Sequence, residues 1–155
     1  MDLKALIAKA KAEIESSVAL AQVDVGGELA EVEFGMIPGH EWADLMAQCP
    51  PRHGAKTDEN LGFNSDKVSA VYPLEKVRVD GESIDAETWA ELLDVLPSPS
   101  IKALALVLWR LNQVGPAERI VELGKARAGA QSKKRRSPAN SGSRSGGLPG
   151  GNPQK

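Results

Sequence analysis

Residues 101–112 limit the fold of this chain more than any other segment, because apolar side chains surround almost the whole of it. They are Ile101, Leu104, Ala105, Leu106, Val107, Leu108, Trp109 and Leu111. A helix that is hydrophobic on nearly every side is buried in a core. The chain has 155 residues, of which 41% are hydrophobic, which is enough for one core. We therefore expect one domain with this helix at its centre.

Apolar residues recur in steps of three and four in several other segments, which predicts further helices. Residues 3–20 carry one such stripe, and residues 38–48 carry a shorter one that Pro50-Pro51 ends. Asp85 is suited to cap the next helix. Gly115-Pro116 is expected to begin the last one, because proline is favoured in a first turn. The stripes are Leu3, Leu6, Ile7, Ala10, Ile14 and Val18; Trp42, Leu45 and Met46; Trp89, Leu92, Leu93 and Leu96; and Ala117, Ile120 and Val121.

Apolar and polar residues alternate over residues 23–36, which indicates a β-hairpin with Gly26-Gly27 as its turn. One face of this hairpin is apolar and includes Phe34, whereas the other carries Glu31 and Glu33. Two strands alone are marginally stable in water, so the hairpin must pack on a helix or pair with another chain. The predicted fold class is therefore α+β and mainly α-helical.

Residues 51–65 are polar and contain glycine, which predicts an exposed loop with Leu61 and Phe63 as its anchors. After this loop, Ser65 or Asp66 is placed to cap a short helix that Pro73 stops. Asp80-Gly81 is expected to form a turn.

The two ends of the chain differ in charge. Residues 1–128 contain 21 acidic and 13 basic residues, whereas residues 129–155 contain six basic residues and no acidic one. The second stretch is rich in Ser, Gly and Pro and has little to bury, so we expect a disordered tail after a helical interaction domain of residues 1–128. The run Lys133, Lys134, Arg135, Arg136 is a candidate for nucleic-acid contacts, whereas the acidic domain favours a protein partner.

The residues that usually carry chemistry form no recognisable motif. Cys49 is the only cysteine, and its spacing from His40 and His53 fits no zinc pattern. Glu28, Glu31 and Glu33 are typical of a solvated strand face or a docking edge. We therefore expect neither an enzyme nor a cofactor. The chain shows no export signal and no membrane-spanning run, which favours the cytoplasm.

Apolar residues in amphipathic elements are the candidate partner contacts. Tryptophan on an apolar helix stripe usually packs in the core, but it is also enriched in interface hot spots. Trp42 lies on the shortest predicted helix, so we select Trp42, Leu45 and Met46 as contacts, together with Phe34 from the apolar face of the hairpin.

The order of several short features resembles the tail assembly chaperones of long-tailed (siphovirus-type) bacteriophages. The similarity spans roughly residues 20–125 and consists of a layout and a few aromatic positions. Its features are Trp42 with a proline before it, Gly62-Phe63-Asn64, the stretch from Val77 to Gly81, the stretch from Asp85 to Leu93, and Trp109 to Asn112.

This resemblance implies a non-enzymatic protein in the cytoplasm of the infected host cell. Such a chaperone binds the tape measure protein, keeps its long helices soluble and yields to the tail tube protein. In this family the short protein is commonly made together with a longer, frameshifted form. The resemblance leaves open whether the chain forms homo-oligomers. The basic tail has no counterpart in the family pattern. The alternative is a structural virion protein, either a tail or a head-tail subunit, whose tail contacts DNA or a neighbouring subunit.

Overall fold

The computed structural model describes the backbone of residues 1–143 and the side chains of residues 1–131. The chain divides into two units, Met1–Pro116 and the part that begins at Ala117. The first unit combines helices with a four-stranded antiparallel sheet, so the predicted α+β class with mainly helical content is confirmed. This unit ends earlier than the predicted domain boundary at residue 128.

The sheet has the strand order β1-β2-β3-β4. Its members are β1 (Val18–Val25), β2 (Glu28–Gly35), β3 (Val77–Val79) and β4 (Glu82–Ser83). Gly26 and Gly27 have φ of 63° and 92°, the left-handed backbone that a two-residue hairpin turn requires. The predicted hairpin and its glycine turn are confirmed. The turn at Asp80 and Gly81 is confirmed too, but the two short strands that it joins were not predicted.

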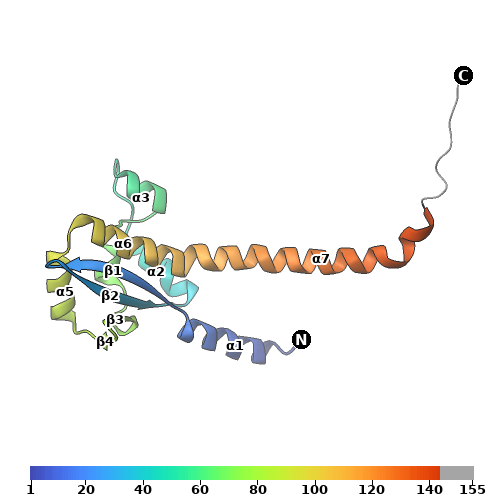
Figure 1. Cartoon of the computed structure of the whole chain (residues 1–155), viewed down its shortest axis with the longest axis horizontal. Coiled ribbons are helices and arrows are strands. Elements are labelled where there is room, and N and C mark those ends of the chain that lie inside the picture. Colours follow the sequence, from blue (N-terminus) through green and yellow to red (C-terminus); the bar gives the residue numbers. More distant parts are fainter. Residues whose placement is uncertain (144–155) are drawn as a thin grey trace, which may run out of the picture. The chain divides into compact units, whose positions relative to one another are not determined.

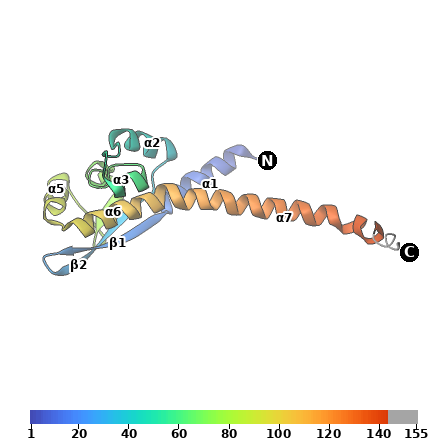
Figure 2. The same cartoon turned by 90° about the horizontal axis from the view of Figure 1, so that it is seen from above.

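The remaining elements of the described residues are helical. They are α1 (Leu3–Ser16), α2 (Gly39–Gln48), α3 (Lys56–Leu61), α4 (Val68–Val71), η1 (Leu74–Lys76), α5 (Ala86–Val95), α6 (Ser98–Trp109), the π turn η2 (Arg110–Val114) and α7 (Gly115–Ser143). Helix α6 lies between the hairpin on one side and α2 and α3 on the other (Figures 1 and 2). Its Leu104 and Leu108 are fully buried, which confirms the predicted central helix.

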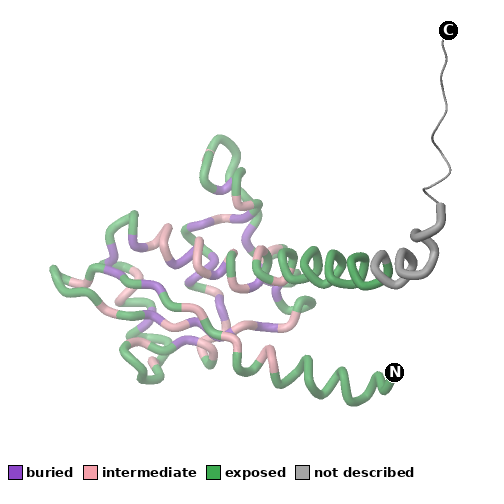
Figure 3. The backbone as a smooth tube through the Cα atoms, turned by 45° about the vertical axis from the view of Figure 1, so that its right-hand side comes forward, coloured by how far each residue is buried: buried purple, intermediate pink, exposed green. Residues whose placement is uncertain are grey.

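The core gathers around Phe34, which projects from the inner face of β2 and is fully buried (Figure 3 shows the buried segments in purple). Its ring meets Tyr72 edge-on at a centroid distance of 5.5 Å and Trp89 at 6.3 Å. The Tyr72 hydroxyl donates to the Gly35 carbonyl at 2.6 Å and accepts from the Asn112 side chain at 3.0 Å. Burial raises the pKa of Tyr72 to about 12, so the hydroxyl stays a donor at neutral pH.

The first helix is shorter than predicted. It ends at Ser16, and residues 18–20 belong to β1 instead. The Ser17 hydroxyl donates to the Glu13 carbonyl at 2.6 Å, a local bond that competes with continued helix at this point. All eight residues of β1 then pair with β2. Val18 and the residues after it thus gain a partner strand, which a longer helix would not have given them.

The last helix, α7, begins at Gly115 as predicted, but it follows α6 without a break through a π turn. The backbone runs from α6 through η2 into α7, and the Gly115 N–H donates to the Arg110 carbonyl five residues earlier. This wider π turn accommodates a proline that an α-helix interior would not tolerate. Residues 129–143 of the predicted tail continue α7, and residues 144–155 lie outside the described residues.

The predicted loop of residues 51–65 contains the short helix α3, which its polar sequence did not suggest. Phe63 is fully buried and Leu61 is half-buried, so both anchor this segment as expected. Helix α4 begins after Lys67 without a side-chain cap, so neither Ser65 nor Asp66 caps it.

A pair of buried serines gives a first test of the core. Ser69 Oγ has no hydrogen-bond partner among the described residues, whereas Ser65 Oγ bonds both Asp58 and Lys102 at 2.8 Å. Removing an unsatisfied buried hydroxyl relieves its desolvation cost. The free energy of unfolding of Ser69→Ala, measured by urea denaturation, should therefore equal that of the wild type or exceed it by up to about 1 kcal/mol. Ser65→Ala should lose about 1–3 kcal/mol, and the reverse order would contradict the described hydrogen bonds.

Candidate partner-binding surface

The residues predicted to contact a partner lie mostly inside the first unit. Phe34, Trp42 and Leu45 have exposed fractions of 0%, 7% and 4%, and Met46 is half-buried. Trp42 packs edge-on against Phe63 at 5.8 Å, and its indole N–H donates to Gln113 at 3.2 Å. Core packing thus accounts for these side chains in the folded chain. Their partner contacts stay a prediction that would require this core to open.

An apolar groove of about 330 Å³ lies at the turn end of the hairpin. This volume falls in the range of about 300–1,000 Å³ that is usual for binding pockets. Its walls come from β1, β2, β3, the segment after β4, and α5. The lining residues are Val25, Glu28, Leu29, Ala30, Val79, Asp80, Ile84, Thr88 and Leu92. Leu29 lies at the rim of the groove, on the same face of β2 as Glu31 and Glu33, and its side chain is 72% exposed.

Two tight turns fix the shape of this groove. The β1–β2 turn holds Glu28 and Leu29 at its edge, and the β3–β4 turn holds Asp80. The Asp80 N–H donates to the Glu31 carbonyl at 2.8 Å, and its carboxylate accepts from the Glu31 N–H at 2.8 Å. These bonds keep Asp80 in place although its φ is 49°, an uncommon conformation for a residue other than glycine. The rim is therefore held in position before any partner arrives.

The surroundings of the groove are strongly acidic. Residues 18–35 and 77–96, which contribute its walls, contain ten acidic residues and one basic residue, Arg78. Arg78 lies 4.0 Å from Glu33, so part of its charge is already engaged. A partner that presents apolar side chains flanked by lysine or arginine would match the groove in both shape and charge.

Helix α1 presents a second uncovered apolar surface. It has no buried residue, and Leu3, Leu6 and Ile7 are 62%, 46% and 46% exposed. Figure 3 shows this helix exposed along most of its length. The predicted stripe is present as far as Ile14, which is half-buried, whereas Val18 belongs to β1; the first unit leaves Leu3, Leu6 and Ile7 uncovered.

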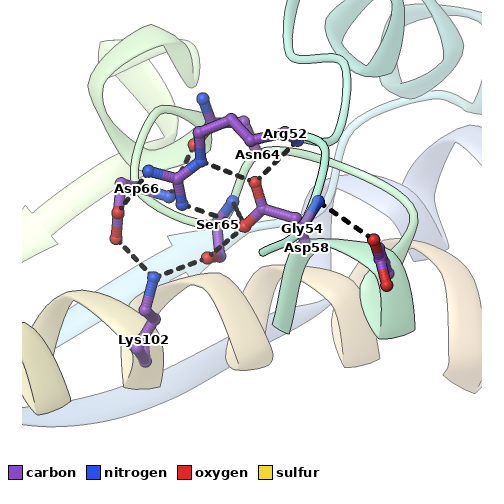
Figure 4. A network of polar contacts seen from close by, with 8 residues as sticks. Arg52, Gly54, Asp58, Asn64, Ser65, Asp66 and Lys102 are labelled. Atoms are coloured by element: carbon purple, nitrogen blue, oxygen red, sulfur yellow. Dashed lines mark hydrogen bonds and ion pairs between the residues drawn. The ribbon is translucent and has the colours of Figure 1, made fainter. Parts of the chain in front are cut away.

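A polar network fastens the loop before α3 to the central helix (Figure 4). The fully buried Asp58 carboxylate accepts from Arg52 Nε at 2.7 Å and Nη2 at 3.0 Å, and from the Ser65 N–H and hydroxyl at 3.0 and 2.8 Å. Lys102 of α6 donates to Ser65 at 2.8 Å and to Asp66 at 2.7 Å. The Arg52 guanidinium holds the pKa of Asp58 well below its ordinary value, so this carboxylate is charged at neutral pH.

The residues that were considered for catalysis or metal binding lie either in the core or on the surface. Cys49 is fully buried, and burial raises the pKa of its thiol, which opposes formation of the reactive thiolate. His40 and His53 are exposed. Among the described residues, no group of His, Cys, Asp or Glu side chains gathers in a way that could hold a metal ion.

The predicted nucleic-acid contacts Lys133, Lys134, Arg135 and Arg136 fall within the backbone range of α7. Their side chains lie outside the part of the chain whose side chains the structure describes. Their role stays a prediction.

Sequence reasoning missed the groove, although one signal for it was present. Leu29 occupies the same strand face as Glu31 and Glu33, so it is an apolar residue on an otherwise acidic face. Such a break in alternation can mark a contact surface. Its partners in the groove, Ile84 and Leu92, come from segments about fifty residues later, and no local pattern links them to the hairpin.

Two further findings bear on function. Within residues 1–143, no helix combines the length and hydropathy that crossing a bilayer requires. Comparisons with protein families, curated proteins and solved structures find no match to this chain.

Proposed function

We propose that this chain is a bacteriophage tail assembly chaperone, which binds the tape measure protein in the cytoplasm of the infected host cell. The acid-rimmed apolar groove at the turn end of the hairpin supports this proposal most directly. The layout of aromatic residues that resembles this family adds to it. The client's helices are held soluble until the tail tube protein replaces the chaperone.

The physical basis is recognition of an amphipathic helix in a groove. The apolar face of the client helix covers Val25, Leu29 and Leu92, and its flanking basic residues face the acidic rim. Charge complementarity speeds association and selects helices with basic flanks. A groove of about 330 Å³ takes only a few side chains, so binding is weak enough for the client to be released. Binding without catalysis is sufficient for this role.

The test is co-expression with the tape measure protein. The wild-type chain should raise the soluble fraction of the client and co-purify with it. Leu29→Asp replaces an exposed apolar side chain at the rim of the groove by a charge. Binding should weaken roughly tenfold or more, because the apolar face of the client would desolvate this charge at a cost of more than about 1.4 kcal/mol. Val95→Asp is the matched control, because Val95 is 67% exposed on α5 and does not line the groove.

The results separate this role from its alternative. Loss of client binding in Leu29→Asp but not in Val95→Asp supports the chaperone. Equal loss in both variants, or no gain in client solubility with the wild type, contradicts it. Recovery of the chain in stoichiometric amounts from purified virions would instead make it a structural tail or head-tail subunit.

A further inference from the structure

Helix α1 needs a partner for its apolar stripe. It is 14 residues long, and apart from Asp2, which caps it by accepting from the Ala5 N–H at 3.2 Å, little stabilises it. Isolated helices of about this length are marginal in water, and most helical stability in proteins comes from packing of an apolar face. Three large side chains, Leu3, Leu6 and Ile7, are nonetheless exposed. The helix therefore carries a surface suited to bind elsewhere.

The groove at the hairpin turn complements this helix. Its walls are apolar, and the segments that form it contain ten acidic residues and one basic residue. Helix α1 carries Lys4, Lys9 and Lys11 in its first three turns, near Leu3, Leu6 and Ile7, whereas its two acids, Glu13 and Glu15, lie in its last turn. The apolar and basic residues in the first three turns of α1 thus match the walls and the acidic rim of the groove.

The same copy cannot join these two surfaces as it is folded. Helix α1 enters β1 at Val18, at the open end of the hairpin, whereas the groove lies at the turn beyond Val25 (Figure 1). A strand of eight residues separates the two ends, which is about 25 Å at roughly 3.3 Å per residue. Helix α1 points away from the turn in both views (Figures 1 and 2). A second copy can supply the helix without refolding either chain.

We propose that α1 of one copy docks in the groove of a second copy, with Leu3, Leu6 and Ile7 against its apolar walls and beside Leu29 at its rim. Because helix and groove are different surfaces, the contact is heterologous and propagates head to tail. The docked helix also occupies the site that the proposed function gives to the client. The inference itself rests on this chain alone and requires no client.

The test uses the purified chain without any client, in sedimentation velocity at rising protein concentration. The wild type should form dimers and larger species. Ile7→Asp disrupts the apolar surface of the helix, and Leu29→Asp disrupts the surface of the groove. Each variant alone should therefore remain monomeric. Val95→Asp should behave as the wild type does. Circular dichroism checks that each variant is folded, since all three positions are exposed in the structure.

A mixture of the two variants is the decisive sample. Leu29→Asp still has its helix and Ile7→Asp still has its groove, so the mixture should form a one-to-one dimer and nothing larger. A wild type that stays monomeric at every concentration overturns the proposal. So does assembly that Leu29→Asp leaves unchanged, because the helices would then pair with each other. Neither result affects client binding, which is measured separately.

Discussion

Replacing Phe34 by alanine should destabilise the first unit more than any other change considered for this protein. Its ring is fully buried and packs edge-on against Tyr72 and Trp89. Removing such a ring leaves a cavity that its neighbours fill only in part, at a cost of about 3–5 kcal/mol. Thermal unfolding followed by circular dichroism should therefore shift downward by roughly 10 °C or more.

Leu29→Ala is the matched control for this experiment. Leu29 lies on the same strand but is 72% exposed, so its loss should change the free energy of unfolding by less than about 0.5 kcal/mol. A Phe34→Ala chain that unfolds at the wild-type temperature, yet no longer binds its partner, would contradict the core role. It would restore the interface role that the sequence suggested.

Asp58→Asn should give the second largest loss. The amide of asparagine turns one acceptor oxygen into a donor that faces the donors of Arg52 and Ser65. Breaking one side of a buried charged network is strongly destabilising, but Arg52 has a side chain that is 44% exposed and retains water. We expect a loss of about 2–4 kcal/mol in urea denaturation at pH 7.

The effect of Asp58→Asn should depend on pH in a defined direction. The folded-state pKa of Asp58 is lowered, so its stabilising contribution is present above the unfolded-state pKa, which is about 3.9, and is lost as the pH falls below it. The difference between wild type and variant should thus shrink below about pH 4. Asp66→Asn is the control, because Asp66 is 44% exposed and its ion pairs should contribute less than about 1 kcal/mol. An equal loss in both variants would contradict the buried role of Asp58.

Local patterns were sufficient to predict much of the fold. The glycine pair and alternation gave the hairpin, and Asp85 caps α5 by accepting from the Thr88 N–H at 2.8 Å, as its position suggested. The apolar run of α6 placed that helix at the centre of the unit. In each case a short stretch of sequence contains the whole physical cause.

Features that depend on distant partners could not be read in the same way. The strand β3 exists because Val77 and Val79 pair with Phe34 and Val32, more than forty residues earlier. The π turn at Arg110–Val114 places Asn112 so that it accepts from the Ile37 N–H at 3.1 Å. Asp58 appeared to be an ordinary polar loop residue, because its partners Arg52 and Ser65 follow no periodic spacing.

The predicted partner contacts show the same difference between local and distant causes. Trp42 and Leu45 formed a convincing amphipathic stripe, but a stripe does not tell whether its apolar face meets the same chain or another one. The fold settles this by burying Trp42 and Leu45 of α2 and leaving the first turns of α1 and Leu29 uncovered. The surfaces available to partners are thus those whose apolar side chains the first unit leaves without cover.

The central claim is that the client binds in the groove, and site-specific photo-crosslinking tests it most directly. A photoreactive amino acid is placed at position 29 or at position 95, and each chain is co-expressed with the tape measure protein. We predict a crosslink to the tape measure protein from position 29 and none above background from position 95. Absence of a crosslink from position 29, or equal crosslinking from both positions, would contradict the account.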